Sequence, residues 1–271
     1  MNNSKTFQTI AWIATGFTLF VIVVGAWVRL TDAGLGCPDW PGCYGKITWP
    51  QAEEHIAQAN EVWGHIREVE SGKAFREMFH RYIASGLGLL IAALAVLAWI
   101  RRRQPDQPVV LPFVLLGLVM FQGALGMWTV TLLLKPAIVT AHLIGGMSTF
   151  ALLLWLSLKV TPRQHPPTLP ARAQHGAVVA VLLLVVIQIL LGGWVSTNYA
   201  AMACTGFPSC NGQWWPAMDF GEGFRIWRGI GVDYEGGVLD PAARAAIHMT
   251  HRIWAVVVVA GFIWLLARLW R

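Results

Sequence analysis

Six stretches of the chain are apolar over about twenty residues or more and contain few charged side chains. A helix that rises ~1.5 Å per residue needs about 20 such residues to cross ~30 Å of hydrocarbon. The pattern therefore predicts membrane-spanning helices near residues 8–28, 77–100, 109–132, 137–158, 174–196 and 245–267. An even number of spans places both chain termini on the same side of the membrane.

The composition supports an integral membrane protein without a separate soluble domain. Of the 271 residues, 56% are hydrophobic and only 13% are charged, which is too apolar for an ordinary soluble domain. Only one lysine, Lys5, precedes the first stretch, and no small-residue cleavage site follows it, so we expect a retained span rather than a signal peptide. The sequence thus predicts an all-α polytopic membrane protein.

Positive charges on the short connections set the predicted orientation. They follow the second span, the fourth span and the last span: Arg101, Arg102, Arg103, Lys159, Arg163, Arg172, Arg268 and Arg271. By the positive-inside rule these segments and both termini face the cytoplasm, and residues 29–76, 133–136 and 197–244 face outward. The formal charge of +6 follows from this topology, so we expect no nucleic-acid partner.

Two of the outward connections carry the same polar pattern. Residues 34–43 read GLGCPDWPGC and residues 201–210 read AMACTGFPSC, with five residues between the cysteines in each case. The next spans open with M-F-H-R at 78–81 and M-T-H-R at 249–252. The pattern predicts parallel internal repeats. We expect residues 1–160 to form a complete four-helix bundle and residues 161–271 a partial second copy with two spans.

Histidines inside the predicted spans are candidate metal ligands. Four lie near the outer ends of spans: His80, His142, His248 and His251. The other four lie in or next to loops, where we expect solvated side chains: His55, His65, His165 and His175. Ionisable residues within a membrane are costly and usually face the bundle interior. His80 and His142 enter at similar depth, which suits axial ligation of a heme, although each could instead hydrogen-bond a neighbouring helix.

Charged residues next to these histidines allow two interpretations each. Glu77 precedes His80 by three residues and shares its helical face, so it either marks the interfacial end of the span or lies beside a porphyrin as a proton-handling carboxylate. Arg81 and Arg252 follow the two repeated histidines directly. They either pair with heme propionates or extend to the membrane interface.

The motifs together resemble the heme A synthases of bacteria and mitochondria. The segments that carry the resemblance are GAWVRLTDAGLGCPDWPGCYG, EMFHRYIASG, QGALGMWTV and TAHLIGG, and the match extends from the first to the sixth span. The resemblance implies a membrane oxidoreductase that converts heme O to heme A by oxidising a ring methyl to a formyl group, for cytochrome oxidase. It also implies a fold of two four-helix bundles, each with a pair of histidines for one heme.

The resemblance assigns roles to individual residues. It makes His80 and His142 the axial pair for the substrate heme, His251 a ligand of a resident heme b, and Glu77 the catalytic candidate. His248 is a weaker ligand candidate than His251, because both lie on one face of one helix. Spans seven and eight of the family pattern, with a fourth histidine, are absent from these 271 residues. We therefore expect one bis-histidine heme at most in this chain.

Cys37 and Cys43 match the family's outward-loop pair, and Cys204 and Cys210 repeat it, so the short spacing predicts two local disulfides. We expect Cys37 to pair with Cys43 and Cys204 with Cys210, in an oxidising compartment outside the membrane. A structural staple and a redox role both remain open. The alternatives to heme A synthesis are a membrane thiol-disulfide oxidoreductase and a non-catalytic heme-binding assembly protein; neither cysteine pair has the C-x-x-C spacing of the former.

The predicted location is the inner, or plasma, membrane, with the cysteine loops on the periplasmic or extracellular side. The candidate partners are the lipid bilayer, heme O synthase, cytochrome oxidase assembly factors and a second copy of the chain.

Overall fold

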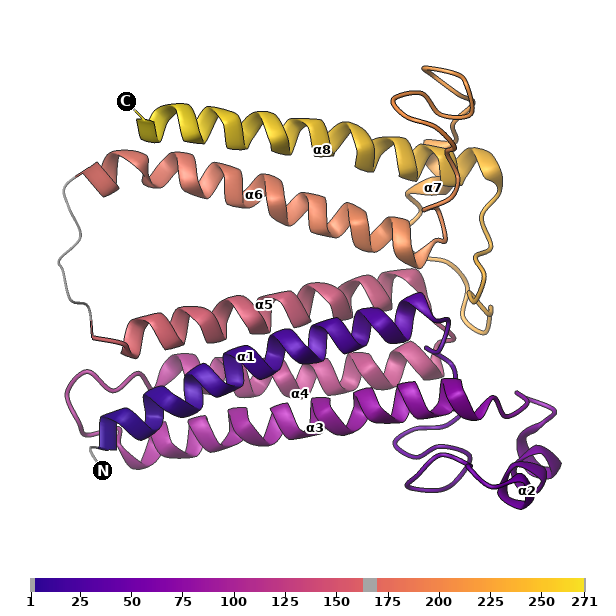
Figure 1. Ribbon diagram of the computed structural model, residues 1–271, viewed down its shortest axis with the longest axis horizontal. Helices are drawn as coiled ribbons and strands as arrows, with labels where there is room; N and C mark the ends of the chain where they lie inside the picture. Colours follow the sequence, from indigo (N-terminus) through magenta and orange to yellow (C-terminus); the bar gives the residue numbers. More distant parts are fainter. Residues whose placement is uncertain (1–2, 163–169, 271) are drawn as a thin grey trace. The chain divides into compact units, whose positions relative to one another are not determined.

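The computed structural model describes residues 3–162 and 170–270, and within these ranges every regular element is an α-helix. In chain order they are α1 (Asn3–Leu30), α2 (Glu53–Trp63), α3 (Ser71–Ile100), α4 (Val110–Thr131), α5 (Pro136–Val160), α6 (Pro170–Thr197), α7 (Phe220–Gly223) and α8 (Pro241–Trp270) (Figure 1). Arg163, His165 and Arg271, which the sequence analysis placed in a loop or at the chain end, lie outside the described residues. The predicted all-α class is confirmed.

Six of the described helices are long and apolar enough to cross a membrane, as predicted: Lys5–Leu30, Ser71–Ile100, Val110–Thr131, Pro136–Val160, Gln174–Thr197 and Pro241–Trp270. Four of the helices begin several residues earlier than their predicted spans, α1 at Asn3, α3 at Ser71, α6 at Pro170 and α8 at Pro241. In α8 the start is set by a cap, because Asp240 Oδ1 accepts the N–H of Ala243 at 2.8 Å and proline suits the first helical position. The short helices α2 and α7 were not predicted.

The described residues form two compact units, 3–134 with 141–162, and 135–140 with 170–270. In the first unit α1 packs on α3 and α3 on α4, and α5 runs beside them (Figure 1). The hydroxyls of Thr15 and Ser157, 2.9 Å apart, join α1 to α5. The main apolar core is made of Phe7, Ala11, Ala14, Val21, Leu87, Ile91, Leu94, Ala98, Leu115, Leu153 and Leu156. All but Val21 lie in the helix halves remote from the connection between α1 and α3, whereas His80 and His142 lie in the halves nearer to it.

The connection between α1 and α3 is a folded cap with its own small core. This core consists of Cys37, Cys43, Tyr44, Ala59, Ala74 and Met78, with Trp49, Trp63 and Val69 packed against them. Asp39 closes the cysteine turn, because its carboxylate accepts the N–H groups of Tyr44 at 2.6 Å and Gly45 at 2.9 Å. The Tyr44 hydroxyl donates to the carbonyl of Glu68 at 3.1 Å, and burial raises the pKa of Tyr44 to about 12. The phenol therefore stays a neutral donor that ties the two ends of the cap together.

In the second unit α6 and α8 pack along each other, and α7 packs on α8 (Figure 1). The indole N–H of Trp194 donates to the carbonyl of Gly223 at 2.8 Å, which joins α6 to α7. Lys135 is almost fully buried, and its Nζ lies 3.3 Å from the ring centroid of Trp227. A desolvated cation over an indole face is a favourable contact. These contacts hold the connection between α6 and α8 against the rest of this unit.

Candidate functional site

His80 and His142 lie in the first unit on α3 and α5, which run in the same direction (Figure 1). Both imidazoles are partly buried, and the Nδ1 atom of each is buried without a hydrogen-bond partner in the described structure. The two rings are close enough to interact electrostatically. The structure thus brings the two candidate ligands into one part of one bundle. Buried polar atoms normally have partners, so two unsatisfied imidazoles point to a bound group.

Glycines of the neighbouring helices pack against both imidazoles. A Cβ added at Gly25 of α1 would lie 3.0 Å from Cε1 of His80, closer than side-chain carbons normally approach. A Cβ added at Gly126 of α4 would lie 3.7 Å from Cε1 of His142. His80 therefore packs closely on the backbone of α1, where a side chain would collide with its ring, whereas the contact of His142 with Gly126 is an ordinary one.

We predict that Gly25→Ala lowers heme occupancy of the first unit, because the new methyl group would displace the His80 ring. Gly16→Ala is the matched control on the same helix, since nothing lies within 4 Å of a Cβ at that position. The measurement is the heme absorption spectrum and the heme-to-protein ratio of the purified chain. Equal occupancy in the two variants would contradict the prediction.

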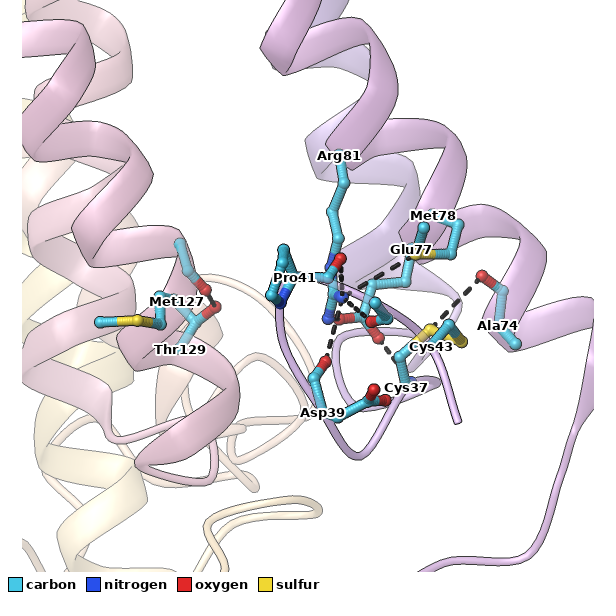
Figure 2. A network of polar contacts seen from close by, with 12 residues as sticks. Cys37, Asp39, Pro41, Cys43, Ala74, Glu77, Met78, Arg81, Met127 and Thr129 are labelled. Atoms are coloured by element: carbon cyan, nitrogen blue, oxygen red, sulfur yellow. Dashed lines mark hydrogen bonds and ion pairs between the residues drawn. A yellow bond between two sulfur atoms is a disulfide. The ribbon is translucent and has the colours of Figure 1, made fainter. Parts of the chain in front are cut away.

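Glu77 is buried on α3 and bonds the cysteine loop. Its Oε2 accepts the backbone N–H of Cys37 at 2.8 Å, and its Oε1 pairs with Arg81 one turn along the helix (Figure 2). Arg81 also donates to three main-chain oxygens of the loop, those of Asp39, Pro41 and Gly42. Both side chains therefore anchor the loop to α3, and Arg81 does not extend freely to the membrane interface.

The second unit holds its cysteine loop with a different residue set. Arg252 donates to the carbonyls of Gly206, Ser209 and Cys204 at 2.9, 3.1 and 3.3 Å. His248 stands three residues before His251, where the first unit has Glu77 before His80, and its Nδ1 lies 2.8 Å from the carbonyl oxygen of Ala200. Within the described part of the chain no carboxylate pairs with Arg252. The arginine anchor is thus common to both loops, whereas the carboxylate occurs only in the first.

His251 is engaged by a residue that the sequence analysis did not single out. The side-chain amide nitrogen of Gln188 on α6 lies 2.9 Å from Nε2 of His251. A Cβ added at Gly192, one turn along α6, would lie 3.2 Å from the same ring nitrogen. The second unit therefore repeats the pairing of a helix glycine with an imidazole and adds a hydrogen-bonding glutamine.

The structure contains both predicted disulfides, Cys37–Cys43 and Cys204–Cys210, each with a sequence separation of 6. All four cysteines are buried, with at most 6% of their surface exposed. Thiol-disulfide exchange requires access of a thiolate to a sulfur atom. Burial therefore favours a structural role and argues against the thiol-disulfide oxidoreductase alternative.

We predict that replacing Cys37 and Cys43 together by serine destabilises the chain by about 2 kcal/mol, the value expected for closing so short a loop. The Cys204 and Cys210 double variant is the matched comparison and should lose a similar amount. Thermal unfolding of the detergent-solubilised proteins, followed by circular dichroism, measures both. Unchanged unfolding midpoints, or crossed disulfides in the native chain by mass spectrometry, would contradict the assignment.

A shared sequence pattern could have revealed the glutamines. Residues 122–128 read QGALGMW on α4 and residues 188–194 read QILLGGW on α6, so a glutamine, a glycine and a tryptophan recur at the same spacing. The glutamine precedes the glycine by four residues, which places both on one helical face. Because the glycines contact histidines, the glutamines lie beside the same rings.

Comparison with known proteins places these features in a wider group. Residues 8–271 match the profile of a family described as cytochrome oxidase assembly protein. A protein named heme A synthase from Shewanella oneidensis is 45% identical over 255 residues, which cover 93% of this chain and 76% of that protein. One of the same name from Rhizorhabdus wittichii is 30% identical over 256 residues, covering 87% and 69%. Another from Erythrobacter litoralis is 29% identical over 274 residues, covering 93% and 77%.

Proposed function

This chain belongs to the cytochrome oxidase assembly protein family, and from that membership and its histidine pair we propose that it is a heme A synthase. It is then a multi-pass membrane oxidoreductase that takes heme O as substrate and releases heme A. The chemical change is the oxidation of a ring methyl to a formyl group. The observation that carries the proposal is the pair of partly buried imidazoles, His80 and His142, whose Nδ1 atoms lack partners in the described structure.

The first unit suits the substrate. His80 and His142 come from two helices of this unit, α3 and α5, and are the residues that would hold the heme iron. The rings pack against Gly25 and Gly126 of the neighbouring helices. Glu77, one turn before His80, is the catalytic candidate. A guanidinium has five N–H donors, so Arg81 retains capacity for a heme propionate while it anchors the loop.

The second unit is proposed to hold a resident heme b. His251 would hold the iron of this heme, and Arg252, one residue further, would pair with a propionate as proposed for Arg81. His248 is the weaker candidate, because its Nδ1 already contacts the Ala200 carbonyl. Ligation through Nε2 of His251 would require the amide of Gln188 to move from that atom. Among the described residues of this unit, His251 is thus the one that we propose holds the heme iron.

We propose that the two units are parallel copies of one ancestral unit, divided near residues 160 and 161. The likeness of their cysteine loops supports this. Each loop has a disulfide and a pair of backbone hydrogen bonds beyond its second cysteine, between Cys43 and Lys46 and between Cys210 and Gln213. Each is also held by the arginine that follows a histidine, Arg81 or Arg252.

The proposed topology places both termini in the cytoplasm and the disulfide loops outside the inner, or plasma, membrane, where oxidising conditions maintain them. Heme O synthase would supply the substrate, and cytochrome oxidase assembly factors would receive the product. A second copy of the chain is the remaining candidate partner.

Chromatography of extracted hemes tests the proposed function directly. The chain is expressed in a host that makes heme O but not heme A, and membrane hemes are separated and quantified. Appearance of heme A is the expected result. A low-spin heme spectrum of the purified chain without any heme A product would instead support the non-catalytic heme-binding alternative.

A further inference from the structure

A cavity in the connection between α6 and α8 is lined by two arginines. It has a volume of about 230 Å³, and its lining residues are Arg225, Arg228, Gly229, Val232, Tyr234 and Val238. The hydroxyl of the buried Tyr234 donates to the carbonyl of Gly229 at 3.0 Å, which fixes the turn between two of the lining residues. The proposed function does not use these residues, so the cavity is a separate candidate binding site.

The two guanidinium groups carry more positive charge than the one carboxylate that pairs with them. Both pair with Glu222, Arg228 through its side-chain and main-chain oxygens and Arg225 at 3.8 Å. The Nε of Arg228 is buried with no hydrogen-bond partner in the described structure. Asp233 and Glu235 are close in the chain, but the described residues that line the cavity include no carboxylate. The cavity therefore suits an oxyanion, because a buried N–H needs an acceptor and arginine N–H groups match the oxygens of a phosphate.

Apolar side chains next to these arginines in the chain are exposed. Ile226, Trp227 and Ile230 have 70%, 60% and 74% of their surface exposed. The Trp227 ring also contacts Nζ of the buried Lys135, which lies 3.3 Å from the ring centroid and holds the segment in place. Exposed apolar groups beside a cationic cavity are suited to an anion that carries an apolar part.

The cavity lies close to the ends of α6 and α8. Gly223 accepts the indole N–H of Trp194 at 2.8 Å, and a Cβ added at Gly223 would lie 2.8 Å from the carbonyl oxygen of Ala243. Trp194 is in the last turn of α6 and Ala243 in the first turn of α8. Arg225 follows Gly223 by two residues, so their Cα atoms are within about 7 Å. Both helices are long enough to span a bilayer, so their ends, and the cavity with them, lie near the lipid headgroups.

We propose that this cavity binds the phosphodiester group of an anionic phospholipid. The guanidinium groups of Arg225 and Arg228 donate hydrogen bonds to the phosphate oxygens, and the exposed apolar side chains contact the adjoining acyl chains. A zwitterionic phospholipid binds less well, because its own cation offsets the charge that the arginines select. Free phosphate binds less well because it has no apolar part.

Native mass spectrometry of the purified full chain in detergent tests the proposal, with added dioleoyl phosphatidylglycerol or dioleoyl phosphatidylcholine. The wild-type chain should bind phosphatidylglycerol about tenfold more tightly than phosphatidylcholine, and Arg225→Gln and Arg228→Gln should each lose most of this preference. Arg268→Gln is the control, because it removes the same charge from an exposed position at the other end of α8, and it should keep the preference. Equal affinity of the wild-type chain for the two lipids, or an equal loss in all three variants, would overturn the proposal.

A second pair of variants covers the case in which loss of the pairs with Glu222 disturbs the connection. Val238→Trp fills the cavity without a change of charge and should also lose the preference, whereas Val256→Trp, at an exposed position on α8, is its control and should keep it. Inorganic phosphate at the same concentration as phosphatidylglycerol should not displace the lipid. Equal results for the two tryptophan variants would overturn the proposed site, and displacement by equimolar phosphate would overturn the phospholipid as its occupant.

Discussion

Replacing either His80 or His142 with alanine is expected to abolish the six-coordinate, low-spin heme of the first unit. Both rings face a helix glycine, and both leave Nδ1 buried and unbonded in the described structure. Because the ligands come from two separate helices, loss of either leaves the iron with one protein ligand at most. Absorption and electron paramagnetic resonance spectra of the purified variants, with heme-to-protein ratios, measure the effect.

His55→Ala is the control for this pair, since His55 is exposed on α2 in the cap between α1 and α3. It should retain the wild-type spectrum. His251→Ala should also retain the low-spin signal of the first unit, because that residue belongs to the other unit. A low-spin spectrum that survives in both His80→Ala and His142→Ala would show that other residues ligate the iron.

Most of the helical architecture follows from the sequence because apolar length alone specifies a membrane span. The residues at which the helices begin and end are predicted less accurately from the sequence. Helix α8 begins at Pro241, ahead of its apolar stretch, since the Asp240 cap determines its start. The helices α2 and α7 lie in connections without a long apolar run, and their formation depends on packing within the folded connections. Hydropathy carries no information about such contacts.

The candidate ligands could be found from depth and repetition, but their surroundings could not. Arg81 donates hydrogen bonds to main-chain oxygens of a loop some forty positions earlier. Every residue has a main-chain carbonyl, so the sequence does not indicate which of them accept such bonds. Similarly, the bond of Gln188 to His251 joins two helices across the second unit. The recurring glutamine, glycine and tryptophan were visible, but only the packing of α6 on α8 shows which ring the glutamine reaches.

Replacing Glu77 by glutamine is expected to leave heme binding intact and to slow conversion of heme O to heme A by about 10²- to 10⁴-fold, the range for loss of a positioned acid or base. The glutamine carbonyl can still accept the Cys37 N–H, and Arg81 keeps its loop carbonyls, so the loop should stay anchored. What the variant loses is the carboxylate itself. The measurement is the initial rate of heme A formation, alongside the heme spectrum. Glu70→Gln is the control, because Glu70 is an exposed carboxylate beside the start of the same helix.

Comparison with the second unit shows why Glu77→Gln would distinguish a catalytic role of Glu77 from a role in holding the cysteine loop. Arg252 holds its cysteine loop through three carbonyls, and no carboxylate pairs with it among the described residues. Anchoring a loop of this kind therefore does not require a negative charge, and anchoring alone does not account for the carboxylate of Glu77. If Glu77 were only an anchor, Glu77→Gln would convert heme O at the wild-type rate, or would slow only when the Cys37–Cys43 disulfide became easier to reduce. A large fall in rate with unchanged reduction kinetics of that disulfide is the outcome that assigns the carboxylate to chemistry.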